Sequence, residues 1–456
     1  MGPVVNWEER VVSDTAELRQ VVETAMEELG VPGVALGLIR DGQEYTAGFG
    51  ITNVNHPLDV DADTLFQIGS ITKTFLGTAV MRLVEQGKLQ LDTPVSEYIP
   101  DFTMQDVGAA SSVTMRHLLN HTAGWTGDYF DDTGTGEDAI DRMVRQMAEI
   151  PQLTPLGEMF SYNNAGFYVA GRVIEIVTGQ PFEAALKELV LDPLGMQMTF
   201  FFPDDVMVHR FAVGHGGKGD DLKVMTPWAL ARCANPAGGL ASSVNDMLTY
   251  ARFQLGEQPQ ILSDASVTTM RTPSKAIDTF GNHVGVTWML RNIGDVRIIT
   301  HSGGTNGQIS LFLTVPERGF GMVILTNNGS GGQLTTRVMK WALKHYLNAE
   351  DAEPELQDRT PEQLGAYAGH YQAALSSIDL SIEDGNLMAQ VTPVGGFPKK
   401  DSPAGPTPPA VRVAFCGEDQ LIALDPPFTD THIDILRDDA GEIAWIRLGS
   451  RIARRQ

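Results

Sequence analysis

The sequence has few cysteines and no long apolar run. Its 456 residues include only Cys233 and Cys416, which lie far apart without metal-type spacing, so both are expected to be small buried side chains. No window approaches the about 18 consecutive apolar residues of a membrane-spanning helix. The N-terminal MGPVVNWEERVV also lacks the basic start and apolar core of a signal peptide. A cytoplasmic protein without a membrane partner is therefore expected, unless an export signal precedes the sequence as given.

Basic residues are also in short supply. The chain has 33 Lys and Arg against 57 Asp and Glu, a formal charge of −24, which repels nucleic acid and anionic lipid and excludes both as expected partners. The acidic run DYFDDTGTGED at 128–138 is expected to be a solvated loop, with a border of the binding cleft as the alternative because the run lies between two motifs. The hydrophobic content of 42% is that of an ordinary globular protein. Because single cores stop growing near about 300 residues, two domains are expected.

Residues 1–349 predict an α+β domain. Two extended runs near the start are joined by Asp41 and Gly42, a strong hairpin signal because this dipeptide accepts positive φ. Strands return near residue 300 and are expected to complete an antiparallel sheet. Apolar spacing and end signals predict helices at residues 15–29, 70–86, 114–120, 137–149, 164–178 and 332–347.

The rest of the chain predicts a small all-β domain at 361–456. Residues 350–360 are acidic, contain proline and lack large apolar groups, as expected of a linker. Further on, alternating apolar residues flank a turn at Asp384 and Gly385. The proline- and glycine-rich stretch 393–409 predicts an irregular loop.

One short motif carries catalytic chemistry, Ser70-Ile-Thr-Lys73. A serine hydroxyl is a poor nucleophile near neutral pH, so a serine enzyme supplies a base and donors for the oxyanion. Residues three apart share a helix face, and a lysine shielded from water loses its proton below its usual pKa. Alone, the pattern also fits a helix N-cap followed by a surface lysine.

Two further motifs follow in order along the chain. Tyr162-Asn-Asn164 lies at the start of a predicted helix, where a capping asparagine behind a packed aromatic residue is the simpler explanation. His301 ends a predicted strand and is followed by Ser302, Gly303 and Gly304, where glycines let a backbone N–H approach a bound carbonyl, although a simple approach to a hairpin also explains them. The occurrence of the three motifs in this order supports a catalytic role more strongly than any one motif does alone.

Ser-x-x-Lys, Tyr-x-Asn and His-x-Gly in this order resemble the signature of the penicillin-recognising serine hydrolases. LLNHTAG at 118–124 and NPAGGLASSVNDM at 235–247 are similar to segments of the class C β-lactamase-like branch, and the similarity spans residues 20–345. The resemblance implies an antiparallel sheet flanked by helices, with the site in a cleft. It also implies roles: Ser70 as nucleophile, Lys73 and Tyr162 as the proton-handling pair, Asn164, His301, Gly303 and Gly304 as substrate-binding residues, and the backbone N–H groups of Ser70 and Gly304 as the oxyanion hole.

The resemblance leaves the substrate open. Most β-lactamases of this type have lysine where this chain has His301, so a permanent cation for a lactam carboxylate is missing or depends on protonation of the histidine. We therefore expect a serine hydrolase for small amides, peptides, including those with D-amino acids, or short-chain esters, resembling the D-aminopeptidase, D-Ala-D-Ala carboxypeptidase and esterase branches. A β-lactamase and a non-turnover penicillin-binding protein are the alternatives.

The last domain also carries a resemblance. LGAYAGHYQ at 364–372, followed by alternating strands, is similar to the lipocalin-like barrel appended to several peptidases of this branch. Such a unit either narrows the cleft or serves as a stabilising or dimerising module. A homo-oligomer is therefore one of the expected states.

No cofactor or metal is expected. DVDAD at 59–63 resembles the opening of a calcium loop, but Thr64 and Ser70 stand where that loop requires glycine and glutamate. His209 and His215 lie in a glycine-rich loop and are not expected to bind a metal. The expected partner is a small-molecule or short-peptide substrate.

Overall fold

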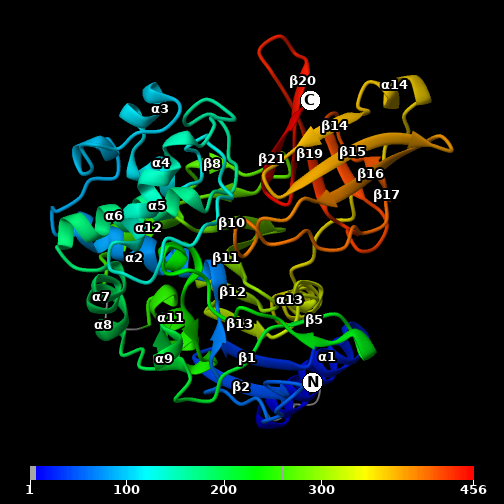
Figure 1. Cartoon of the computed structure of the whole chain (residues 1–456). Helices are drawn as coiled ribbons and strands as arrows, with labels where there is room; N and C mark the ends of the chain where they lie inside the picture. Colours follow the sequence, from blue (N-terminus) through cyan, green and yellow to red (C-terminus); the bar gives the residue numbers. More distant parts are fainter. Residues whose placement is uncertain (1–6, 258–260) are drawn as a thin grey trace.

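The structure is a computed structural model that describes residues 7–257 and 261–456 (Figure 1). Its centre is an eight-stranded antiparallel sheet in the order β2-β1-β13-β12-β11-β10-β9-β8. The sheet thus joins the first two strands of the chain to strands near residue 300, as predicted. The strands are β1 (Gly33–Arg40), β2 (Gln43–Gly50), β8 (Lys275–Ala276), β9 (His283–Val284), β10 (Met289–Ile293), β11 (Val296–Gly304), β12 (Ile309–Val315) and β13 (Phe320–Thr326).

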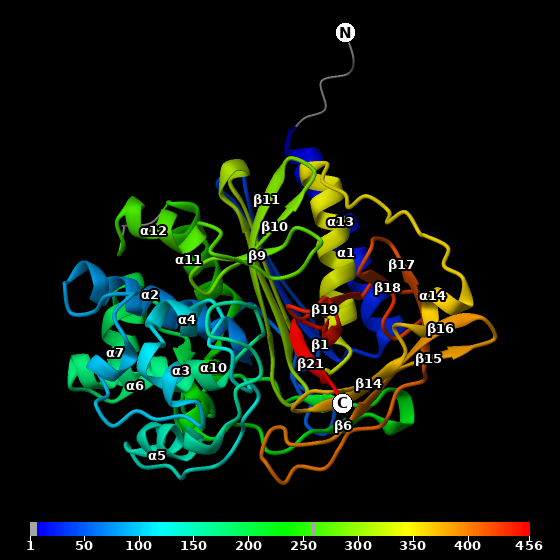
Figure 2. The same ribbon diagram turned by 90° about the horizontal axis from the view of Figure 1, so that it is seen from above.

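Helices cover both faces of the sheet, so the central strands are apolar on both sides (Figure 2). On β1, Val34 and Leu36 pack toward α1 (Trp7–Leu29) and α13 (Gly331–Leu347), whereas Ala35 belongs to the core on the opposite face. This alternation follows from the two-residue period of a strand. The expected α+β class with helices flanking an antiparallel sheet is confirmed.

A mostly helical region covers the face of the sheet opposite α1 and α13. Its helices are α2 (Thr72–Glu85), α3 (Val107–Ser112), α4 (Met115–Leu119), α5 (Ala139–Gln146), α6 (Ala165–Thr178), α7 (Phe182–Leu186), α8 (Asp192–Leu194), α9 (Pro203–Val206), α10 (Asn235–Gly238), α11 (Val244–Leu255) and α12 (Asp264–Arg271). A small three-stranded sheet accompanies them, in the order β3 (Phe66–Gln67), β7 (Ala241–Ser242) and β4 (Thr199–Phe200). The strand pair β5 (His215–Gly216) and β6 (Lys223–Val224) lies near α1 and α13 (Figure 1). Across the described ranges, no helix combines the length and the apolar character needed to span a bilayer.

Two predicted helix starts were wrong. The first helix begins at Trp7 instead of residue 15. The second begins at Thr72, because residues Gly69–Ile71 form a separate 3₁₀ turn, η1, ahead of it. Ser70 therefore lies in that turn, immediately before the α-helix that carries Lys73.

The C-terminal part of the chain forms a closed eight-stranded barrel, which confirms the expected all-β unit. The short helix α14 (Pro361–Gly365) precedes it, and alternate strand residues such as Ile378 and Leu380 fill its core. As expected, no strand or helix is assigned between Pro393 and Val411. The strands are β14 (Gly369–Gln372), β15 (Ser376–Glu383), β16 (Asn386–Pro393), β17 (Val411–Phe415), β18 (Gln420–Ala423), β19 (His432–Arg437), β20 (Ile443–Leu448) and β21 (Arg451–Arg455).

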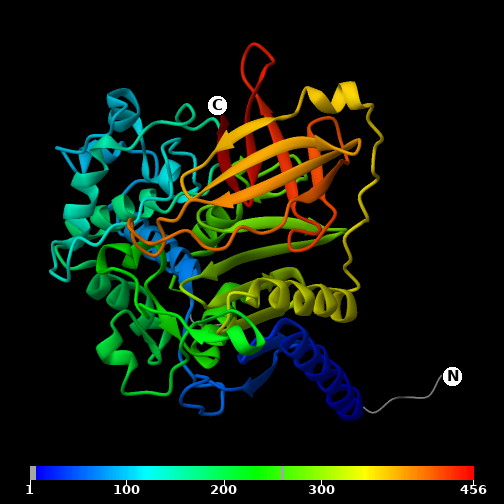
Figure 3. The same ribbon diagram turned by 45° about the vertical axis from the view of Figure 1, so that its right-hand side comes forward.

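The barrel packs against the sheet region and approaches the helical region. Figure 3 shows the chain leaving α13, running along the molecule and entering the barrel through α14. A buried ion pair within the barrel, Arg447 to Asp434 at 3.0 Å, also bonds the first part of the chain: Arg447 Nε donates to the Phe160 carbonyl, and Asp434 accepts from the Thr279 N–H. The barrel is therefore attached where the predicted motif residues lie.

Candidate active site

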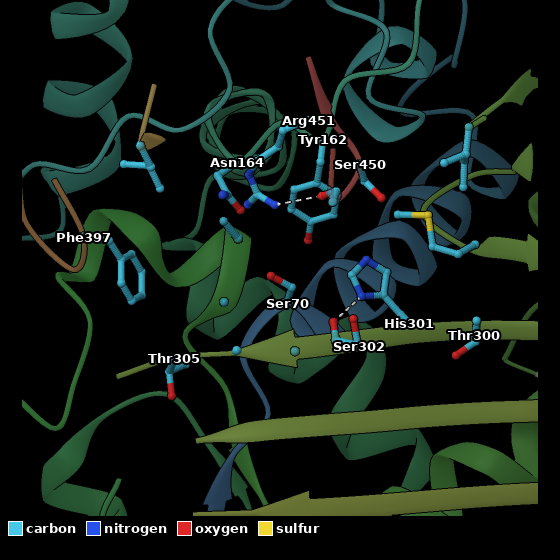
Figure 4. Close-up of a pocket in the computed structure, with 18 of the residues that line it drawn as sticks. Ser70, Tyr162, Asn164, Thr300, His301, Ser302, Thr305, Phe397, Ser450 and Arg451 are labelled. Atoms are coloured by element: carbon cyan, nitrogen blue, oxygen red, sulfur yellow. Dashed lines mark hydrogen bonds between the residues drawn. The ribbon is translucent and has the colours of Figure 1, made fainter. Parts of the chain in front are cut away.

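A cavity of about 630 Å³ lies at the end of β11, between the helical region and the barrel. Six of the seven predicted site residues line it, and the seventh, Lys73, is fully buried beneath Ser70. Figure 4 shows Tyr162, Asn164 and His301 gathered around Ser70, with Arg451 beside Tyr162. The three sequence motifs thus meet in one place.

Glycines bring the backbone of β11 close to Ser70. Gly69 has φ +51°, and a Cβ atom there would lie 2.6 Å from the backbone nitrogen of Gly304. A Cβ atom on Gly303 would lie 1.9 Å from the carbonyl oxygen of Ile68. Only glycine fits either position, so the turn that holds Ser70 and the strand end that holds Gly304 come together as the motifs predicted.

Lys73 is the buried centre of the site. Its Nζ lies 3.1 Å from Ser70 Oγ, 2.8 Å from Asn164 Oδ1 and 2.5 Å from the carbonyl oxygen of Ala237. Burial, and then the charge of Arg451, lower the pKa of Lys73 well below its usual value. In this arrangement Nζ donates to all three oxygens. Because its pKa is lowered, the amine can lose one of these protons, and its lone pair can then accept the Ser70 hydroxyl proton.

Tyr162 is buried with its ring against charged and aromatic groups. His121 stacks on the ring at a centroid distance of 4.4 Å, and the guanidinium of Arg451 lies 4.9 Å from the ring centroid. Burial raises the pKa of Tyr162, while the neighbouring Ser70 hydroxyl and Arg451 act in the opposite direction. Oη has no partner of good hydrogen-bond geometry among the described residues, but it lies near enough to the Ser70 hydroxyl to act on a group bound there.

Asn164 occupies the N-cap position of α6 but does not cap the helix through its side chain. Its side chain makes no capping bond at the start of α6, and Asn163 takes that role by accepting the Gly166 N–H at 2.8 Å. Asn164 instead bonds Lys73 through Oδ1 and Asp128 through Nδ2, the latter at 2.8 Å. The motif asparagine therefore belongs to the site.

His301 is a buried neutral imidazole. It lies within β11, which continues to Gly304, and not at the strand end that was predicted. Its Nδ1 lies 2.6 Å from the Ser302 carbonyl, which can only accept, so Nδ1 carries the proton and Nε2 is the free acceptor. Burial, followed by the charge of Lys73, lowers the pKa of His301 to about 3. The side chain is thus a hydrogen-bond acceptor and not a cation.

Two charged residues of the site were not among the predicted site residues. Arg451 of the barrel binds Asp128 through Nε and through Nη2, the latter at 3.2 Å, and the Asp128 side chain is only 4% exposed. Asp128 opens the acidic run that was expected to be a solvated loop, an expectation that is wrong for this residue. No local pattern marks Arg451, because its partner lies 323 positions earlier in the chain.

Other predictions fall outside the site. His215 is buried, with Nε2 accepting the Val54 N–H and Nδ1 bonded to the Asn327 carbonyl, so it supports loops instead of lying in an open one. Cys233 is buried as expected, whereas Cys416 is only partly buried, and the two thiols are free.

The chain belongs to the Beta-lactamase family, whose sequence profile matches residues 18–343. It is 32% identical over 373 residues to penicillin-binding protein 4 of Amycolatopsis lactamdurans, which covers 79% of this chain and 98% of that protein. The solved structure of SurE with D-Leu matches with a TM-score of 0.75 at 24% identity, over 97% of this chain and all of that one. D-amino acid amidase from Ochrobactrum anthropi SV3, complexed with L-phenylalanine amide, matches with a TM-score of 0.59 at 24% identity, over 72% and 99%.

Proposed function

We propose that the protein hydrolyses small amides, peptides or short-chain esters through an acyl-enzyme on Ser70. Membership of the family of β-lactamase-like serine hydrolases supports the reaction class. The observation that carries the proposal is the 3.1 Å contact between Ser70 Oγ and the buried Nζ of Lys73, whose pKa is lowered. A nucleophile within hydrogen-bonding reach of a neutral amine is what acyl transfer requires.

In the first half of the reaction, Ser70 Oγ attacks the substrate carbonyl while its proton moves to Lys73 Nζ. The backbone N–H groups of Ser70 and Gly304 receive the oxyanion of the tetrahedral intermediate. Tyr162 Oη donates a proton to the leaving nitrogen or oxygen, and the proton held by Lys73 restores the tyrosine. The carbon–nitrogen or carbon–oxygen bond breaks, and the acyl group remains on Ser70.

In the second half, water attacks the acyl-enzyme carbonyl. The proton of the water returns through the Tyr162 and Lys73 pair to Ser70 Oγ, and the acid product leaves. Asn164 holds Lys73 in place through its 2.8 Å hydrogen bond. Each step moves one proton between groups that lie around one cavity.

The neutral His301 supports amides, peptides and esters over lactams. A substrate recognised by a carboxylate next to β11 needs a cation there, and His301 offers a lone pair at Nε2 instead. Such an acceptor suits a substrate N–H. The D-Leu in the SurE structure and the name of the D-amino acid amidase favour testing substrates with D-residues.

The alternative is a protein that binds penicillin without turnover, which the name of the Amycolatopsis relative favours. A fluorescent penicillin that stays on Ser70 for hours, without ester or amide turnover, would support this alternative. Steady release of nitrophenol from p-nitrophenyl acetate supports the hydrolase.

The proposal is tested with a substrate panel on the full chain and on Ser70→Ala. The panel holds D- and L-amino acid amides, D-Ala-D-Ala peptides, p-nitrophenyl esters and a chromogenic cephalosporin, ranked by kcat/KM. We expect amides or esters to rank first and Ser70→Ala to lose turnover of all of them. Activity of Ser70→Ala equal to that of the parent would overturn the proposal.

A further inference from the structure

The segment that carries Tyr162 is held by the barrel and not only by its own domain. Three consecutive residues of this segment bond to β20, to β21 or to the turn between these strands. The bonds are Arg447 Nε to the Phe160 carbonyl at 3.2 Å, the Ile452 N–H to Ser161 Oγ at 3.3 Å, and the Tyr162 N–H to the Ser450 carbonyl at 2.8 Å.

The turn of this hairpin has the geometry needed for these bonds. Leu448 pairs with Arg451, and the two residues between them, Gly449 and Ser450, both have positive φ, of 57° and 68°. Positive φ at both central positions is the pattern of a tight two-residue hairpin turn that matches the twist of its strands. The turn therefore presents the Ser450 carbonyl to Tyr162 and the Arg451 side chain to the cavity.

Arg451 also fixes the orientation of Asn164 through one intermediate residue. Its guanidinium binds the carboxylate of Asp128, which in turn accepts from Asn164 Nδ2 at 2.8 Å. A carboxylate only accepts, so the amide nitrogen of Asn164 must face Asp128 and its oxygen must face Lys73. Without this anchor, the amide is free to turn its nitrogen toward Lys73.

We propose that the β20–β21 hairpin is a positioning element of the active site, in which Arg451, through Asp128 and through its contact with the Tyr162 ring, holds the proton-handling groups in their reactive arrangement. This inference rests on the proposed function, since it concerns the same site. Arg451 is a positioning residue here, because it acts through Tyr162, Asp128 and Asn164. A displacement of about 1 Å at such groups costs about 100-fold in rate.

The charge of Arg451 gives this role a signature that a purely structural contact lacks. The titratable groups around Lys73 are Asp128, Tyr162, His121 and His301, together with the permanent cation of Arg451. After burial, Arg451 lowers the pKa of Lys73, whereas Asp128 raises it. Loss of the guanidinium favours protonated Lys73, so the acid limb of the activity profile moves to higher pH. Loss of the Asp128 charge moves the limb the other way.

The test compares Arg451→Ala, Arg451→Lys and Asp128→Asn in the full chain, with p-nitrophenyl acetate across pH. Arg451→Ala is expected to lower kcat about 10- to 100-fold with KM within a few-fold of the parent, and to shift the acid limb to higher pH. Arg451→Lys keeps the limb in place and recovers part of kcat. Asp128→Asn also lowers kcat but shifts the limb to lower pH.

The matched control is Arg412→Ala. Arg412 makes the same kind of two-bond pair with Asp425 elsewhere on the barrel, with nitrogen–oxygen distances of 2.9 Å and 2.6 Å, and does not line the cavity. This variant is expected to keep the kcat, KM and pH profile of the parent. Circular dichroism and thermal unfolding check that each variant folds, and if Arg451→Ala does not fold, Arg451→Lys and Asp128→Asn decide through their limb positions.

Two results would overturn the inference. A parental kcat and an unmoved acid limb in Arg451→Ala would show that the hairpin does not position the site. A rise in KM alone would make Arg451 a substrate ligand instead. Failure of the proposed function would be a separate result. It would appear as hydrolytic activity in Ser70→Ala, independently of the results with the Arg451 variants.

Discussion

At the residue scale, the account depends on an uncharged Lys73. Lys73→Arg replaces the amine with a guanidinium that stays protonated and cannot accept the Ser70 proton. We expect kcat/KM for p-nitrophenyl acetate to fall about 100- to 10,000-fold, the usual contribution of a positioned base. Lys344→Arg, at an exposed lysine paired with Glu350, is the control and should match the parent. Equal activity of Lys73→Arg and Lys344→Arg would exclude Lys73 as the base.

His301 predicts a pH dependence of stability. The pKa of His301 is about 3 in the folded chain, against about 6.5 in an unfolded one, so below pH 6.5 only the unfolded state takes up the proton. Stability therefore falls as pH drops from 6.5 toward 3, by about 1.4 kcal/mol per pH unit from this group. Between pH 7 and pH 5, urea unfolding of the parent should lose about 2 kcal/mol more than that of His301→Gln. Parallel losses in the two proteins would mean that His301 titrates normally.

At the element scale, β11 packs closely against the η1 turn, and this packing sets the distance between Ser70 and the backbone of Gly304. Gly303→Ala would place a Cβ atom 1.9 Å from the Ile68 carbonyl oxygen and push the two elements apart. We expect a loss of stability of about 1–3 kcal/mol and a fall in kcat of about 100-fold.

Gly321→Ala is the matched control for Gly303→Ala. Gly321 lies in β13 of the same sheet, and the nearest atom to its added Cβ would be 3.5 Å away, an ordinary contact. Chemical denaturation and ester hydrolysis should show this variant close to the parent. Gly303→Ala with parental kcat would show that the approach of the two elements does not set the site geometry.

At the scale of the whole molecule, the barrel forms part of the cavity wall through Leu375, Phe397 and the β20–β21 turn. The sequence left two roles open for the barrel, narrowing of the cleft or service as a stabilising or dimerising module. Its place in the cavity wall supports the first role. Near this wall, Arg447 and Asp434 form an ion pair whose side chains are 8% and 3% exposed.

Breaking that pair should loosen the barrel. Arg447→Ala leaves Asp434 buried without its cation, which typically costs about 3–5 kcal/mol, so thermal unfolding should begin at a clearly lower temperature. The double variant Arg447→Met with Asp434→Leu removes both charges and should recover much of that loss. A single variant as stable as the parent would show that the pair contributes nothing to docking.

The sequence predicted the parts of the fold and site that local chemistry determines. Helix periodicity, the Asp41–Gly42 hairpin and the strands near residue 300 are local patterns, and the sheet and helices match them apart from the starts of the first two helices. The roles of the motif residues are proposals. The resemblance of the motif order to the penicillin-recognising serine hydrolases predicted that these residues meet, and Ser70, Tyr162, Asn164 and His301 do line one cavity, with Lys73 buried beneath Ser70.

The features that the sequence did not predict depend on how the barrel packs against the helical region. Asp128 looked like any acidic loop residue, and Arg451 lies near the end of a barrel strand with no motif around it. Their pairing exists only because the barrel closes against the helical region, and neither periodicity nor spacing encodes that contact. The sequence left the charge state of His301 open for a similar reason, since burial by distant segments lowers its pKa.

The most direct test of the central claim is mass spectrometry of the acyl-enzyme. The parent protein is mixed with p-nitrophenyl acetate, quenched with acid within the first turnovers and digested, and the peptide that contains Ser70 is analysed. The account predicts one acetyl group on Ser70 in the parent, its disappearance as turnover ends, and none in Ser70→Ala. An acetyl group that forms on another residue during turnover, with Ser70 unmodified, would contradict the account.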